Sequence, residues 1–141
     1  MVSSETGQQA RSRIPDSEKI TINLGYVDLG HIDLMVQDGF YSNRTDFIRT
    51  AIRSQLDRHA ETVRKAVARK TLDMGLRTYT RDELEAVRAS GEMLRINVLG
   101  LASIGRDVTP ELARATIASV SVLGALHASP EVRAALEDRM R

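Results

Sequence analysis

The fold is decided by six consecutive residues, Lys19-Ile20-Thr21-Ile22-Asn23-Leu24. Apolar and polar side chains alternate strictly along them, so the three apolar side chains share one face and the three polar ones share the other. The segment is short and rich in β-branched residues, and Gly25 follows it. This pattern predicts a β-strand with one buried and one solvated face.

A first helical pattern follows the strand. Apolar residues fall on one face at spacings of three and four between Leu29 and Val36, and Asp28 is expected to cap the N-terminus. Asp38 and Gly39 are expected to end the helix, because glycine adopts the left-handed conformation that often follows a helix C-terminus.

A second helical pattern begins after Gly39. Ser42 is expected to cap it, and Asp46 lies in the first turn, where a negative charge is favourable. An apolar stripe runs from Phe47 to Leu56, so the helix is predicted to reach about His59.

A strand followed by two short helices cannot close a core of its own. An isolated strand is not stable, and the apolar faces of the helices belong to too few residues. Two chains solve the problem by pairing their strands antiparallel and covering the inner face with four helices. The core expected for this intertwined dimer consists of Ile20, Ile22, Leu24, Ile32, Phe47, Ile48 and Ile52.

The outer face of such a ribbon carries Lys19, Thr21 and Asn23 from each chain. A two-stranded ribbon fits the major groove of DNA, where lysine can donate to guanine, asparagine can pair with adenine, and threonine can contact a thymine methyl group. The three outer residues are therefore candidates for base contact.

The start of the second helix is the candidate for phosphate contact. Ser42, Asn43 and Arg44 lie there, where free backbone N–H groups and the positive end of the helix dipole favour an anion. The surrounding charge is mildly basic, with nine Lys and Arg against six Asp and Glu between Lys19 and Lys70.

The segment 19–59 resembles the ribbon-helix-helix family of the MetJ, Arc and CopG repressors. The resemblance lies in the alternating strand and in the run Gly39-Phe40-Tyr41-Ser42-Asn43-Arg44-Thr45-Asp46-Phe47-Ile48-Arg49-Thr50-Ala51-Ile52-Arg53, and it covers 41 of the 141 residues. It implies that Lys19, Thr21 and Asn23 read bases and that Ser42 and Asn43 hold the DNA backbone.

The rest of the chain contains a weak repeat. Ile96-Asn97-Val98-Leu99-Gly100-Leu101 is echoed by Val120-Ser121-Val122-Leu123-Gly124-Ala125, and each copy precedes a Thr-Pro-Glu or Ser-Pro-Glu helix start. Thr80 and Glu83 form a capping box before another helix, residues 81–90. The repeat predicts a small unit in which strands and helices alternate.

The predicted architecture is mainly α with short β elements. Residues 1–18 are expected to form a flexible arm, 19–59 the ribbon-helix-helix domain, 60–77 a basic helical linker, and 78–141 a C-terminal α/β region. The C-terminal region is apolar and lacks convergent polar groups, so oligomerisation is preferred to effector binding as its role.

Several functions are not expected. The chain has no cysteine, and His31, His59 and His127 are far apart, so neither a cofactor nor a metal site is expected, including the nickel site of some family members. No nucleophile lies beside a base, which argues against an enzyme. The polar N-terminus is no secretory signal, and no apolar run is long enough to cross a membrane, so a cytoplasmic, nucleoid-associated protein is expected.

The function expected from the sequence is that of a transcriptional regulator, preferably a repressor, which binds double-stranded DNA as a homodimer or as a pair of dimers. The main alternative is an antitoxin that represses its own operon and binds a toxin through its C-terminal region, although such regions are usually short and fold on binding. A DNA-organising accessory protein is a third alternative.

Overall fold

The computed structural model describes residues 17–141, and most of the arm predicted at residues 1–18 lies outside this described part. The chain divides into two compact units between Ser54 and Gln55. Each unit is described by itself below.

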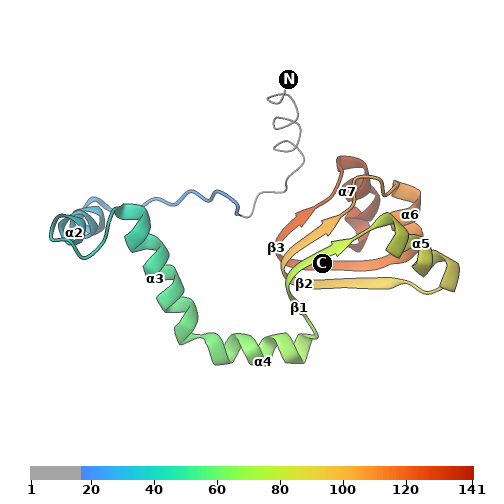
Figure 1. Ribbon diagram of the computed structural model, residues 1–141, viewed down its shortest axis with the longest axis horizontal. Helices are drawn as coiled ribbons and strands as arrows, with labels where there is room; N and C mark the ends of the chain where they lie inside the picture. The colour runs from blue at the N-terminus through green and yellow to red at the C-terminus, as the bar shows by residue number, and fades with distance from the viewer. Residues whose placement is uncertain (1–16) are drawn as a thin grey trace, which may run out of the picture. The chain divides into compact units, whose positions relative to one another are not determined.

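The first unit begins with an extended segment. Residues 18–25 belong to no helix and pair with no strand of the described chain, and they run directly into helix α2, Tyr26–Gln37 (Figure 1). Gly25, rather than the expected Asp28, is the cap residue, so α2 begins before the predicted position. The strand predicted at residues 19–24 remains a prediction, because a strand is defined by the hydrogen bonds it makes to a neighbour.

Helix α2 ends as the sequence predicts. Asp38 is the C-cap residue of α2, and Gly39 has a φ of +85°, in the left-handed region that suits glycine. The Gly39 N–H donates to the Val36 carbonyl at 3.1 Å, and the Phe40 N–H donates to the Met35 carbonyl at 3.0 Å. These two bonds are those of a Schellman motif, which turns the chain sharply towards the next helix.

Helix α3 spans Arg44–Arg58 and is followed by α4, Ala60–Lys70. The N-terminus of α3 is capped by Asn43 and not by Ser42, because the Asn43 side-chain oxygen accepts the Asp46 N–H at 2.8 Å. The prediction was wrong by one residue, since either residue type can accept this bond and only the backbone geometry selects between them.

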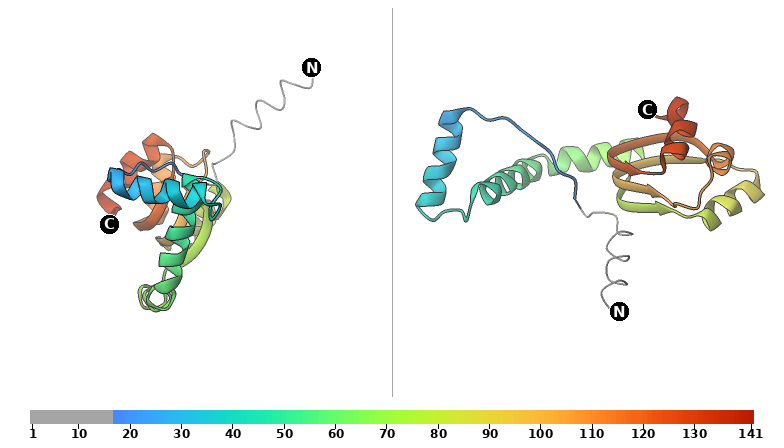
Figure 2. Two further views of the ribbon diagram at one scale, coloured as in Figure 1. Left: turned by 90° about the vertical axis from the view of Figure 1, so that its left-hand side faces the viewer. Right: turned by 90° about the horizontal axis from the view of Figure 1, so that it is seen from above.

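The second unit contains a sheet of three parallel strands in the order β1-β2-β3 (Figures 1 and 2). Helix α5 connects β1 to β2 and helix α6 connects β2 to β3, while α7 follows β3. The bounds are β1 Asp73–Tyr79, α5 Arg81–Ser90, β2 Leu94–Ile104, α6 Pro110–Thr116, β3 Ile117–His127, α7 Pro130–Leu136 and the short 3-10 helix η1 Glu137–Arg139.

Helices α5, α6 and α7 start as the sequence predicts. The side-chain oxygens of Thr80, Thr109 and Ser129 each accept a backbone N–H of the following helix at 3.2 Å. The alternation of strand and helix after residue 94 confirms the predicted repeat.

Strand β1 corrects the predicted linker. The linker was expected over residues 60–77, but α4 ends at Lys70 and Asp73–Tyr79 forms the first strand of the sheet. The prediction was wrong here because Gly75 and the polar residues after it are typical of a loop between secondary-structure elements. The strand is stabilised by pairing with β2, which lies about 25 residues further along the chain.

One core holds the second unit together. It lies on one face of the sheet, where alternate strand residues such as Ile96 and Val98 meet the buried residues of the helices. The buried residues are Tyr79, Leu84, Ile96, Val98, Ala102, Ile104, Val108, Leu112, Ala113, Ile117, Val120, Val132 and Leu136.

A row of three glycines crosses the sheet. Gly75 pairs with Gly100, and Gly100 pairs with Gly124, and all three have φ between +110° and +136°. A Cβ atom on Gly100 would lie 2.2 Å from the Gly75 carbonyl oxygen, and one on Gly124 would lie 2.0 Å from that of Gly100. The three strands therefore pack closely along this row of glycines.

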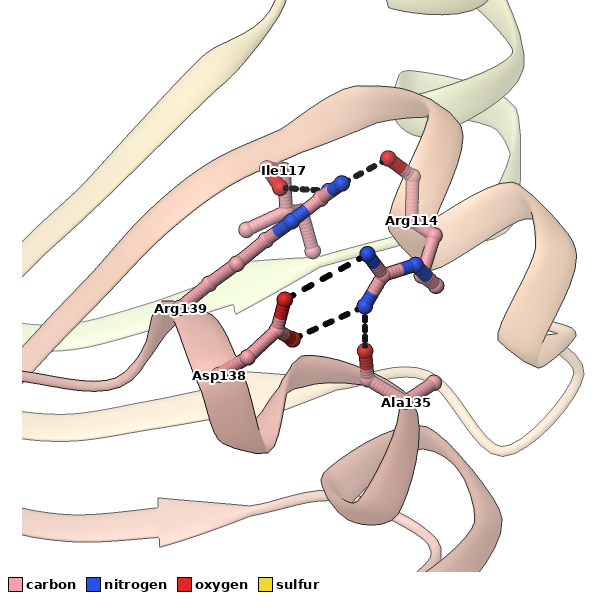
Figure 3. Close-up of polar contacts among 5 residues, drawn as sticks. All are labelled: Arg114, Ile117, Ala135, Asp138 and Arg139. Atoms are coloured by element: carbon pink, nitrogen blue, oxygen red, sulfur yellow. Dashed lines mark hydrogen bonds and ion pairs between the residues drawn. The ribbon is translucent and has the colours of Figure 1, made fainter.

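The C-terminal tail closes the far edge of the sheet. Arg114 of α6 donates to both carboxylate oxygens of Asp138 and to the Ala135 carbonyl, and Arg139 donates to the carbonyls of Arg114 and Ile117 (Figure 3). Met140 forms a parallel bridge with Val120. The outer edge of β3 is thus partly covered by the chain itself.

Candidate nucleic-acid interface

The predicted base-contacting residues lie together on the extended segment before α2. Lys19, Thr21 and Asn23 are all exposed, and no helix or strand of the described chain covers them. The apolar residues between them are exposed as well, and Ile20 keeps 72% of its surface accessible. A segment that exposes β-branched apolar residues in this way is expected to bury its apolar face against a partner.

The apolar residues expected to form a dimer core are mostly exposed in the single chain. Only Ile32 is buried, at 6% exposure, while Phe47 and Ile48 are half-buried. Phe47 packs edge-to-face on Tyr41, with ring centroids 4.9 Å apart. The expected core residues with exposed side chains are Ile20, Ile22, Leu24 and Ile52.

More apolar surface is exposed around α2 and α3 than the predicted core contains. Leu34 of α2, Phe40 of the turn and Leu56 of α3 are exposed, as are Tyr26 and Val27 at the start of α2. The sequence carries the signal for Leu34 and Leu56, because both lie on or beside the apolar stripes of their helices.

Arg44 holds the two helices of this unit together. Its Nε donates to Oδ1 of Asp33 in α2 at 2.8 Å, and its Nη2 donates to Oδ2 at 2.8 Å. The hydrogen bond lowers the pKa of Asp33 and raises that of Arg44. Arg44 was predicted as a phosphate contact alone, and this bidentate pair gives it a structural role that the sequence analysis missed.

The backbone at the start of α3 is arranged by a reciprocal pair of hydrogen bonds. The Ser42 N–H donates to Oδ2 of Asp46 at 2.9 Å, and the Asp46 N–H donates to the side chain of Asn43. The first amides of a helix have no acceptor within it, which leaves those of Arg44 and Thr45 for an external anion. All three predicted phosphate contacts, Ser42, Asn43 and Arg44, therefore lie at one exposed helix start.

Residues 17–141, the described part of the chain, contain no candidate metal cluster and no membrane-spanning helix. No group of three or more His, Asp or Glu side chains in this part of the chain is placed to hold a metal ion. Among the helices described, none has the length and apolar character needed to cross a lipid bilayer.

Comparison with known proteins assigns the class. The sequence model of the ribbon-helix-helix transcriptional regulator family matches residues 15–133. The chain therefore belongs to this family, whose members are DNA-binding regulators of transcription. No curated protein and no solved structure matches the chain.

The family match is longer than the segment from which the resemblance was first drawn. It extends from the exposed segment through the sheet to α7, whereas the resemblance covered residues 19–59. The sheet unit is therefore part of what this family shares.

Proposed function

We propose that the protein is a sequence-specific transcriptional repressor whose dimer inserts a two-stranded antiparallel ribbon into the major groove of DNA. The observation that carries the proposal is the segment Lys19–Leu24, which is exposed on both its polar and its apolar face although it alternates strictly. Pairing with the same segment of a second chain buries the apolar face and leaves the polar face for DNA.

In this proposal the bases are read by the outer face of the ribbon. Lys19 donates to guanine, Asn23 pairs with adenine, and Thr21 contacts either a base edge or a thymine methyl group. The twofold symmetry of the dimer presents each residue twice, so the operator contains two related half-sites.

The DNA backbone is held at the start of α3. The amides of the first turn, the Ser42 hydroxyl and the Asn43 side-chain NH₂ group contact a phosphate. Arg44 Nη1, which makes no bond to Asp33, is left for the phosphate, while the bidentate bond to Asp33 links α2 to α3. The phosphate clamp is therefore preorganised before DNA arrives.

The dimer core is formed by Ile20, Ile22, Leu24 and Ile52, which the single chain exposes, together with Ile32, Phe47 and Ile48. The second unit then serves oligomerisation, and dimers that occupy adjacent half-sites bind cooperatively. The protein acts in the cytoplasm, at the nucleoid, and represses because a bound dimer blocks access to the promoter.

The antitoxin alternative receives less support. Toxin-binding regions of antitoxins are usually short and fold when they bind. The C-terminal unit here has a core of thirteen buried apolar residues. Such a unit is folded before any partner arrives.

The test is recovery of bound fragments from sheared genomic DNA by the purified full-length protein, with the mass of the free protein measured beside it. We expect a dimer and strong enrichment of a few fragments that share paired half-sites. Uniform recovery of all fragments contradicts base reading, and a monomeric mass contradicts the ribbon.

A further inference from the structure

The sheet of the second unit has a face that its helices do not cover. The residues that point away from the core form rows across the three strands, because parallel strands in register place equivalent residues side by side. One apolar row is Met74-Leu99-Leu123, and the next is Leu76-Leu101-Ala125. We call the face that carries these two rows, together with the polar row on either side of them, the open sheet face.

The open sheet face is exposed at both edges. Leu76 of β1 keeps 70% of its surface accessible and Leu123 of β3 keeps 54%, while Leu99 and Leu101 of the central strand are half-buried by their neighbours. Large apolar residues placed in contiguous rows mark an interaction surface, whereas single exposed ones do not.

The chemistry of the centre of the face favours a neutral partner. The rows on either side of the apolar ones are Asn97-Ser121 and Thr78-Ser103-His127, so these four rows contain no Asp, Glu, Lys or Arg. The Asn97 amide donates to the carbonyls of Lys70 and Thr71 at the end of α4, and the exposed Arg95 lies one row further along β2. DNA and acidic or basic peptides are recognised through charge. A neutral face with an apolar centre and a hydroxyl-rich rim is complementary to a surface like itself.

The area of the open sheet face limits which partner can bind it stably. Three strands about 4.8 Å apart and four rows about 6.6 Å apart give an area on the order of 300 Å². A stable interface between freely diffusing proteins buries about 800 Å² on each partner. The face is too small to capture a partner from solution, and it suits one that is already held nearby.

We infer that the open sheet face pairs with the same face of the second chain in the ribbon dimer. The inference rests on the proposed function, because the ribbon dimer supplies two copies of the sheet unit on one molecule. Each is tied to the ribbon by its own α3 and α4, so the local concentration of one unit near the other is on the order of millimolar. The pairing is isologous, with the twofold axis near β2, the centre of the face.

The absence of cysteine from the chain permits a direct test. Leu101→Cys places a thiol at the centre of the open sheet face, and Ala134→Cys, on the exposed side of α7, is the matched control. Packed sheets lie about 10 Å apart, so two facing thiols at position 101 lie within reach of a short bis-maleimide linker. It does not reach between two copies of position 134, which are separated by two sheets and two layers of helices.

We expect cross-linking of Leu101→Cys in the full-length dimer at a level that dilution does not change, and about tenfold less for Ala134→Cys. Adding Leu123→Asp puts a carboxylate on the face at an exposed position, so the yield of cross-linked dimer is expected to fall about tenfold. Circular dichroism is expected to show that the unit is still folded. Adding Ala134→Asp instead leaves the cross-link unchanged.

The outcomes separate this inference from the proposed function. A dimer by mass that cross-links at position 134 but not at 101, or at neither position, overturns the pairing of the open faces and leaves the ribbon standing. A monomer by mass overturns both. Cross-linking that persists when Ile22→Asp has removed the ribbon dimer overturns the argument from area and tethering.

Discussion

The two units of this chain differ in where their apolar residues lie. In the first unit, Ile32 is the one buried large apolar residue of the described part, while eight between Ile20 and Ile52 are exposed. In the second unit, thirteen apolar residues are buried around one face of a sheet. The second unit contains its own core, whereas the first contains half of one.

The difference follows from the pairing of strands. Each strand of the sheet finds a partner about 25 residues along its own chain, because helices α5 and α6 return the chain to the same sheet edge. The segment 19–24 has no strand near it in sequence, and the two helices after it lead away. The first unit is therefore expected to gain its stability from a second chain, and its unfolding depends on protein concentration.

The largest expected effect is that of Ile22→Asp on the first unit. Placing a carboxylate in the shared core costs more than about 4 kcal/mol, which raises the dimer Kd about a thousandfold. Sedimentation of the full-length protein then shows monomers. The matched variant Thr21→Asp places the same charge on the outer face, so it abolishes DNA binding and keeps the dimer. A dimer that survives Ile22→Asp refutes the shared core.

The second effect concerns the glycine row of the sheet. Gly100→Ala forces a Cβ against the Gly75 carbonyl at a positive φ and destabilises the second unit by about 3 kcal/mol. Thermal unfolding of the sheet measures it. The control is Gly30→Ala in α2, which meets nothing within 4 Å and is expected to stabilise the first unit by about 0.5–1 kcal/mol. Equal effects from both variants would show that the glycine row is not constrained.

The third effect concerns recognition of the DNA sequence by Asn23. Asn23→Ala is expected to weaken binding to the operator by about 1–3 kcal/mol while binding to random DNA changes little. Titration of both DNAs at one salt concentration measures the difference, and Gln37→Ala, exposed at the end of α2, is the control. An equal loss on both DNAs would contradict base contact by Asn23.

The smallest effect is the pH dependence of the Asp33–Arg44 pair. The hydrogen bond from Arg44 lowers the pKa of Asp33 in the folded chain below its ordinary value of 3.8. The pair therefore stabilises the protein above about pH 4, and this contribution is lost as the pH falls through the folded pKa. In urea unfolding, wild type is expected to exceed Asp33→Asn slightly at pH 7, with the gap closing towards pH 3. A gap that is constant with pH would assign the effect to another cause.

Local signals in the sequence predicted much of the fold. Capping and periodicity depend on residues only a few positions apart, so a sequence reveals them directly. They predicted the repeat, the glycine after α2, and the helix starts at Thr80, Thr109 and Ser129. The family was predicted from the strand and the helix motif together.

Features that depend on residues far apart in the chain could not be predicted from the sequence. Strand β1 is held by β2, and nothing within Asp73–Tyr79 distinguishes it from a linker. The bond between Arg44 and Asp33 spans eleven residues and depends on the angle of the turn at Gly39. The cap at Asn43 differs from the predicted one because Ser and Asn serve equally well there.

Amide hydrogen exchange along residues 19–24 of the full-length protein tests the central claim most directly. Each strand of a two-stranded ribbon directs every second N–H at its partner and the others at solvent. We predict slow exchange at alternate residues between Lys19 and Leu24, lost in Ile22→Asp. Uniformly fast exchange across the segment, in a protein that is a dimer by mass, would contradict the account.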